Sequence, residues 1–165
     1  MKNKWVHQLL SLVVSLLLVV GCTKGDDKAI LPADPAQMVG NWVLVSPNTG
    51  HTITLTIEPV ITNTMIAPPK FYKISGQGPV NQYSSSLDYA PSGALPDERR
   101  IRIDPVFTVT KIAETAEQSQ ISATYLRNLG QAYQYALTSN GELRLTYDGL
   151  YYELSTPPAL IYKRQ

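Results

Sequence analysis

The chain has 165 residues, of which 44% are hydrophobic and 16% charged, and its formal net charge is +1. This length suits one domain with a proper core, and the composition is typical of a globular fold rather than a disordered or coiled-coil chain. The charge balance gives no strong basic or acidic field, so nucleic acids and polyanions are not expected as partners. Since the chain holds one cysteine, an intramolecular disulfide is excluded.

The first 21 residues have the three parts of a secretory signal. Lys2 and Lys4 form a positive head, residues 9–20 are almost uninterruptedly apolar, and the small residue Gly21 precedes the single cysteine, Cys22. The apolar run is shorter than the roughly 20 residues that a membrane-spanning helix needs. We therefore expect this segment to be a signal peptide that is removed.

Val19-Val20-Gly21-Cys22 resembles the lipobox of bacterial lipoproteins, with an aliphatic first residue and a small residue before the cysteine. The resemblance implies acylation of the Cys22 thiol, cleavage between Gly21 and Cys22, and a further acyl chain on the new amino terminus. Two or more chains, at about 0.8 kcal/mol per buried CH₂, anchor a domain far more firmly than one chain. The alternatives for Cys22 are a remnant of the signal or a buried free thiol.

The residue after the cysteine, Thr23, is not the aspartate that resembles an inner-membrane retention signal. We therefore expect the lipid-anchored protein in the outer membrane, on its periplasmic face or at the cell surface. Residues 22–39 are interpreted as the lipidated tether and linker, because they are charged, contain two prolines and lack periodicity. The folded domain is expected over residues 40–165.

Strict alternation of apolar and polar residues dominates this domain. In residues 51–58, Ile53, Leu55 and Ile57 share one face and threonines the other, as a half-buried strand requires. Further strands are predicted at residues 42–46, 70–75, 81–89, 99–104, 106–112 and 160–164.

Residues 131–155 are predicted to form a three-stranded meander. Asn140-Gly141 and Asp148-Gly149 each stand between alternating runs, and both pairs suit a tight type I′ turn. The residues expected to face inward are Tyr133, Tyr135 and Leu137 on the first strand, Leu143, Leu145 and Tyr147 on the second, and Leu150, Tyr152 and Leu154 on the third.

One segment breaks the alternation and is predicted to be helical. Thr115 and Gln118 have the spacing of a capping box, and Gly130 is expected just beyond the end of the helix. The apolar stripe between them consists of Ile121, Tyr125, Leu126 and Leu129. The predicted fold class is mainly β (α+β): a curved antiparallel sheet or partial β-barrel with one helix packed against it.

The order of these parts resembles the META domain of the HslJ-like lipoproteins. The matching residues are Gly76, Gly78, Asn81, Gln82, Tyr83, Ile101, Ile103, Thr110, Lys111, Ile112, Ala113, Tyr125, Leu126, Leu129 and the run NGELRLTY. The resemblance covers residues 40–165 and implies a small curved sheet with a packed helix. It also implies an envelope protein linked to stress and antibiotic tolerance, with no established reaction.

The chain departs from this family at two positions. Val80 stands where members often have a cysteine before the asparagine, and Glu114 follows Ala113 where a second cysteine is common. Any disulfide of the family is therefore absent from this chain.

No arrangement of residues indicates catalysis, a metal or another cofactor. His51 lies in a turn-rich stretch, and Ser84, Ser85 and Ser86 do not resemble a nucleophile elbow. The mixed charges of residues 97–100 are interpreted as a solvated surface rather than an acid/base pair. We therefore expect a protein that is not an enzyme.

Binding is favoured by the ten tyrosines, against two phenylalanines, because tyrosine combines an apolar ring with a polar tip. If the sheet leaves a gap beneath the helix, the residues expected to line it are Tyr125, Tyr133, Tyr135 and Tyr147; the alternative is that they fill the core.

Three hypotheses for the function follow from these observations. The first is a non-catalytic envelope lipoprotein whose loops at residues 76–83 and 90–98 contact an envelope protein. The second is a lipocalin-like carrier of a lipid or small apolar ligand, for which Gly40-Asn41-Trp42 is a weak signature. A third alternative is an enzyme with an unusual site.

Overall fold

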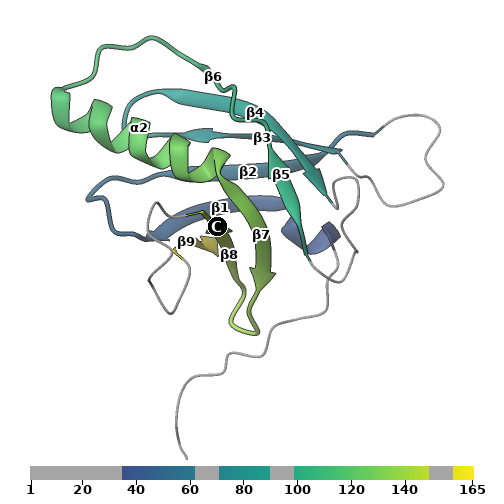
Figure 1. Cartoon of the computed structure of the whole chain (residues 1–165). Helices are drawn as coiled ribbons and strands as arrows, with labels where there is room; N and C mark the ends of the chain where they lie inside the picture. Colours follow the sequence, from purple (N-terminus) through teal and green to yellow (C-terminus); the bar gives the residue numbers. More distant parts are fainter. Residues whose placement is uncertain (1–34, 62–70, 90–98, 149–157) are drawn as a thin grey trace, which may run out of the picture.

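The structure, a computed structural model, describes residues 35–61, 71–89, 99–148 and 158–165 (Figure 1). It is mostly antiparallel β-sheet, nearly closed into a barrel, with one helix packed against it, which confirms the predicted fold class. Several predicted features lie outside the described residues: the signal peptide, Cys22, the loop at 90–98, Gly149 of the Asp148-Gly149 turn, and the third meander strand.

The elements were largely expected from the alternation of the sequence. In chain order they are η1 (Pro35–Met38, a short 3₁₀ helix), β1 (Gly40–Ser46), β2 (Thr54–Pro59), β3 (Phe71–Gln77), β4 (Gln82–Tyr89), β5 (Ile101–Ile103), β6 (Thr108–Val109), α2 (Ala116–Gly130), β7 (Ala132–Leu137), β8 (Glu142–Tyr147) and β9 (Ala159–Arg164).

All described strands belong to one sheet, in the order β5-β4-β3-β2-β1-β9-β8-β7, and β6 pairs with the first part of β4 on the edge that β5 pairs with farther along. The two outermost strands, β5 and β7, approach each other and nearly close the barrel. Their link is a single antiparallel bridge between Arg100 and Gln134, beside which the Tyr135 amide donates to the Arg99 carbonyl at 3.0 Å.

The barrel has two ends that matter for function. Gly40 of β1 pairs with Ile57 of β2, and Phe71 of β3 pairs with Asp88 of β4, so η1 and the β2–β3 connection share one end, which we call the η1 end. Helix α2 follows β6 and precedes β7 at the opposite end, the α2 end, together with the β1–β2 and β3–β4 connections. Figure 1 shows α2 lying across the barrel on the side away from η1.

The inward faces of the strands fill the barrel with side chains. Alternation places one residue in two inside, and Trp42, Tyr72, Tyr135 and Tyr162 are the largest of those with under 2% exposure. The sheet also covers part of the expected linker, because Met38 is fully buried and accepts a hydrogen bond from the Trp42 indole at 2.9 Å. The described fold therefore includes η1, which lies within the predicted linker.

The first hairpin of the predicted meander forms, with two differences. Gly141 has φ +73° but Asn140 does not have a positive φ, so the turn is not type I′. Instead the Thr138 amide donates to the Glu142 carbonyl at 3.0 Å, and the Thr138 carbonyl accepts from the Gly141 amide at 2.9 Å. These bonds close a three-residue loop that contains a left-handed glycine. The two-residue turn prediction was wrong because the glycine alone takes the left-handed conformation.

The second difference is a bulge in β7. Ala132 pairs with Tyr147 and Gln134 with Thr146, so Tyr133 is the extra residue between them. The bulge shifts the alternation by one: Ala132 is buried and Tyr133 half-buried. Tyr135 and Leu137 lie in the core as predicted, whereas the inward position predicted for Tyr133 was wrong.

Helix α2 begins as predicted, with Thr115 and Gln118 forming both bonds of the capping box. Its end differs, because Gly130 is the last helical residue and Gln131 is the cap. A Cβ on Gly130 would lie 3.3 Å from the Phe107 ring and 3.4 Å from Pro105 Cα. A glycine at this position therefore allows the helix to pack closely against the segment before β6.

Candidate functional site

Asn81 fixes the chain segment that leads into α2. Its side-chain oxygen accepts hydrogen bonds from the Thr110 hydroxyl at 2.9 Å and the Ile112 amide at 2.8 Å, and its side-chain nitrogen donates to the Ile112 carbonyl at 3.0 Å. Thr110 in turn accepts from the Gln82 amide at 3.0 Å. Because Asn81 takes both backbone groups of Ile112, β6 is only two residues long instead of the strand predicted over 106–112.

Gly76 and Tyr83 meet across β3 and β4. The Tyr83 hydroxyl donates to the Thr54 carbonyl at 2.6 Å, passing over Gly76. A Cβ on Gly76 would lie 2.0 Å from the Thr54 oxygen and 2.6 Å from the Tyr83 hydroxyl, so no larger residue fits there. Gly78 closes the β3–β4 turn with a 2.8 Å bond from its amide to the Asn81 carbonyl.

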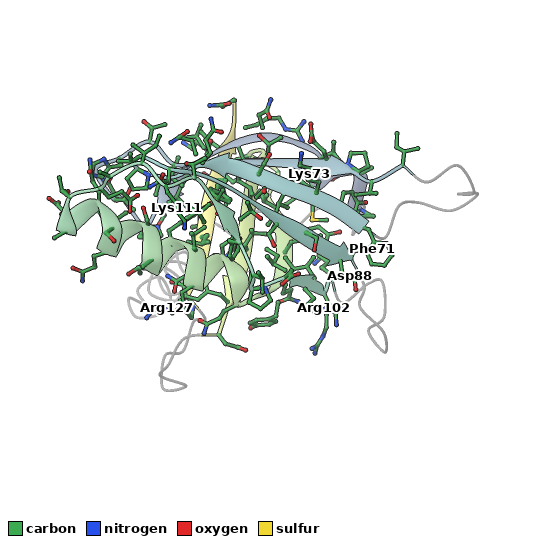
Figure 2. The ribbon with its side chains drawn as sticks, turned by 90° about the horizontal axis from the view of Figure 1, so that it is seen from above. Phe71, Lys73, Asp88, Arg102, Lys111 and Arg127 are labelled. Atoms are coloured by element: carbon green, nitrogen blue, oxygen red, sulfur yellow. The ribbon has the colours of Figure 1, made fainter. Side chains whose placement is uncertain are left out.

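The structure therefore brings five residues of the predicted family motif together: Gly76, Gly78, Asn81, Tyr83 and Thr110. Lys111 stands beside them in the chain but is exposed, on the α2 side of the molecule (Figure 2). The five form a cluster at the α2 end, where three of them, Gly76, Tyr83 and Thr110, also line a surface pocket of about 510 Å³.

Three tyrosine hydroxyls continue this cluster into the core. The hydroxyl oxygens of Tyr83 and Tyr125 are 2.7 Å apart, and those of Tyr125 and Tyr162 are 3.1 Å apart. A carbonyl only accepts, so the Tyr83 proton points to Thr54; Tyr125 must then donate to Tyr83, and Tyr162 to Tyr125. The chain of hydroxyls has one direction, and it joins β2, β4, α2 and β9.

Burial raises the pKa of all three phenols well above the ordinary value. Neighbouring hydroxyls raise these pKa values further. The Tyr125 hydroxyl raises the pKa of Tyr83, and the Tyr162 hydroxyl raises that of Tyr125. Electrostatic interaction with Tyr83 raises the pKa of Tyr162. The three side chains are therefore neutral at physiological pH, and they act as hydrogen-bond partners rather than as bases.

A groove of about 360 Å³ lies at the α2 end, between the helix and the start of the β1–β2 connection. Its apolar residues are Leu44, Pro47, Ile121, Tyr125 and Leu160, and its polar residues are Asn48, Thr49, Glu117, Gln120, Thr124 and Asn128. The groove offers apolar surface edged mainly by uncharged polar groups, which suits a small molecule or a side chain of mixed character.

Of the four tyrosines predicted to line a pocket, Tyr125 lines this groove. Tyr135 lies in the core, its ring 6.0 Å from that of Tyr89, and Tyr133 and Tyr147 are half-buried on the meander. Sequence reasoning missed Tyr162 as the partner of Tyr125, because residues 159–162 are all apolar and their pattern does not show which side chains face inward.

The residues considered for catalysis have local structural contacts. His51 is half-exposed, and its amide donates to the Thr49 hydroxyl at 3.3 Å. The Ser85 hydroxyl donates to the Asp104 carbonyl at 2.8 Å, which fastens the chain between β5 and β6 to β4. Within the described ranges, no three His, Cys, Asp or Glu residues are grouped so as to hold a metal ion. The same ranges contain no helix with the length and apolar character to span a membrane.

Comparison with known proteins gives little. No family model matches the chain, and no curated protein matches it. A solved structure titled "NMR structure of the protein from Burkholderia xenovorans" is similar, with 19% identity and a TM-score of 0.49, over 87% of this chain and 97% of that one.

Proposed function

We propose that the chain is a lipoprotein of the bacterial outer membrane, held by acyl chains on Cys22, whose barrel is a non-catalytic META-type module that binds an envelope protein. The lipobox-like run Val19-Val20-Gly21-Cys22 supports the anchor. The order and spacing of the motif residues support the family, which would give the protein a part in stress or antibiotic tolerance.

The observation that carries the proposal is the opposite placement of η1 and α2. The first described residue, Pro35, stands at the η1 end, 13 residues after Cys22. Extended at about 3.5 Å per residue, that segment reaches roughly 45 Å at most. An anchored barrel would therefore have its η1 end within roughly 45 Å of the lipid and its α2 end on the side away from the tether.

The α2 end has the features of a surface that binds protein. It carries the β3–β4 turn within residues 76–83, which was predicted as a partner loop, and the groove beside α2. The core is filled by large residues such as Trp42 and Tyr135, at 1% exposure each, which favours a module that works through its outside. Loop 90–98, the other predicted contact, lies outside the described residues.

Photo-crosslinking in cells tests the partner. We expect a crosslinking amino acid at Gln120, on the exposed rim of the groove, to trap one defined protein, whereas the same group at Glu58, exposed on the barrel wall toward the η1 end, should not. Adducts with a broad set of neighbours at both positions would contradict a specific partner.

Fractionation tests the anchor. We expect the wild-type chain in the outer-membrane fraction and Cys22→Ser outside it. A wild-type chain found free of the membrane with its leader attached would contradict the proposal.

The groove also favours a second candidate, the lipocalin-like carrier. Its volume of about 360 Å³ suits a small ligand. Native mass spectrometry of the purified lipoprotein would show a bound mass that Ile121→Asp removes. A ligand-free wild-type protein would count against the carrier.

A further inference from the structure

Three large apolar side chains are exposed together at the η1 end. Ile61 is 82% exposed, Phe71 52% and Val60 41%. Val60 and Phe71 are neighbours, because the Val60 amide donates to the Phe71 carbonyl at 3.0 Å. Single exposed apolar residues are ordinary, but three adjacent ones at one edge indicate a surface that is covered in use. We call Val60, Ile61 and Phe71 the apolar tip.

The apolar tip lies at the end of the barrel where the N-terminal segment joins. Gly40, just after η1, pairs with Ile57, and β2 ends at Pro59, next to Val60. Arg164 holds η1 in place, since its guanidinium donates to the Gln37 carbonyl at 2.9 Å and lies 4.8 Å from the centre of the Trp42 ring. The point where the chain leaves toward Cys22 is therefore fixed relative to the tip.

We propose that the apolar tip inserts into the lipid interface of the bilayer to which Cys22 is attached; this rests on the anchoring proposed above. The anchor and the η1 end are at most roughly 45 Å apart along the chain, so contact of the tip with lipid is an intramolecular event at high effective concentration. Exposed Ile and Phe side chains gain by leaving water for the boundary between headgroups and acyl chains.

The charges around the tip favour insertion by apolar contact rather than by attraction to anionic lipid. Among the described residues, these charges are Glu58, Lys73, Asp88 and Arg102, which are mixed in sign, and Asp88 pairs with Arg102 at 3.1 Å. Figure 2 shows Phe71 at the end of the sheet, with Asp88 and Arg102 nearby and Lys111 and Arg127 toward α2. Insertion should therefore be nearly insensitive to salt.

The test uses the full lipidated protein in vesicles of phosphatidylethanolamine and phosphatidylglycerol. Ile61→Cys carries a polarity-sensitive fluorophore, and Ile112→Cys, whose parent side chain is 60% exposed at the α2 end, is the matched control. An acylated Cys22 does not react, so the label reports one position. We expect a blue-shifted emission that rises several-fold and is quenched by spin-labelled lipid at position 61, and a water-like emission at position 112, both unchanged at high salt.

A second variant separates the tip from the probe, which is itself apolar. With the label on Val60→Cys, changing Ile61 and Phe71 to serine should reduce quenching to the level of the position 112 control, while circular dichroism confirms folding. Quenching that persists in this variant would overturn the proposal, because the probe would then drive insertion.

The other outcomes separate the two proposals. A water-like emission at position 61 with an acylated Cys22 overturns tip insertion and leaves the anchor intact. A bare Cys22 thiol in the mass spectrum overturns both. A label at position 61 whose emission shifts to the blue only in outer-membrane extracts, and is not quenched by spin-labelled lipid, is covered by a protein, which also overturns insertion. Loss of the signal at high salt overturns apolar contact as its cause.

Discussion

The missing Cβ of Gly76 is what lets Tyr83 reach the carbonyl of Thr54 across the sheet. One glycine thus determines where the chain of tyrosine hydroxyls ends, and through Tyr125 where α2 rests on the barrel. The side chains of this cluster act through hydrogen bonds at short range, so single atoms decide its stability.

Gly76→Ala should therefore destabilise the protein strongly. The new methyl group collides with a backbone oxygen and displaces the Tyr83 hydroxyl, so we expect a loss of about 3 kcal/mol or more in the free energy of unfolding, measured with urea. Gly141→Ala is the control: a Cβ there meets nothing within 4 Å, and only the left-handed backbone opposes it, by about 1 kcal/mol. Equal losses in both variants would contradict this explanation.

Asn81→Ala should lower the free energy of unfolding by about 2–4 kcal/mol. It removes three hydrogen bonds at a buried position and leaves the amide and carbonyl of Ile112 without their partner. Asn48→Ala, an exposed asparagine bonded only to the Gly50 amide among the described contacts, should change stability by less than about 0.5 kcal/mol in the same urea titration. A small effect at Asn81 would show that Thr110 alone holds the segment.

The buried phenols predict how stability depends on pH. In the unfolded chain they lose protons near pH 10, whereas burial keeps the pKa of Tyr83, Tyr125 and Tyr162 higher in the fold. Above about pH 10 the unfolded state therefore binds fewer protons, and stability falls as pH rises. Below that pH their contribution is complete.

Urea midpoints between pH 8 and 11 measure this dependence. We expect Tyr125→Phe to be less stable at pH 8, because Tyr162 loses its acceptor, and to show a shallower decline above pH 10. An unchanged alkaline slope in that variant would contradict the assignment.

At the scale of elements, α2 shows that local sequence signals can be sufficient to predict where a helix forms. Its start follows from the capping box, and its apolar stripe follows from helical spacing, with Tyr125 and Leu129 buried and Ile121 and Leu126 packed against the core. We expect Thr115→Ala to lower the free energy of unfolding by about 1 kcal/mol, while Thr115→Ser, which keeps the hydroxyl, should stay near the wild type. Differential scanning calorimetry compares the two, and equal losses would mean that the methyl group of Thr115 matters more than its hydroxyl.

Other elements could not be predicted from neighbouring residues alone. β2 and β8 follow from alternation, but the bulge at Tyr133 and the shortness of β6 depend on contacts made far along the chain, such as that of Asn81 with Ile112, 31 positions away. The same holds for the candidate site. Motif order grouped Gly76, Asn81, Tyr83 and Thr110, whereas Tyr162 joins the hydroxyl chain only because β9 returns beside β1.

At the scale of the whole molecule, the barrel is held unevenly around its circumference. β8 is paired along its length on both sides, whereas β5 and β7 share one bridge. In hydrogen exchange, we therefore expect the amide of Tyr135, which bonds across this seam to Arg99, to exchange at least about tenfold faster than that of Leu145 in β8. Equal protection at both amides would mean that the barrel opens only as one cooperative unit.

The bond between Arg164 and Gln37 joins residues 127 positions apart, and it brings the last strand against the first turn of the fold. A short linker from residue 165 to residue 35 would close the backbone into a ring, and the exposed loop at Asn140-Gly141 would then serve as a new pair of ends. Circular permutants of this kind are feasible where the two positions to be joined lie close together. A fluorescent protein fused after residue 165 would sit beside η1 and leave the α2 end of the barrel unobstructed.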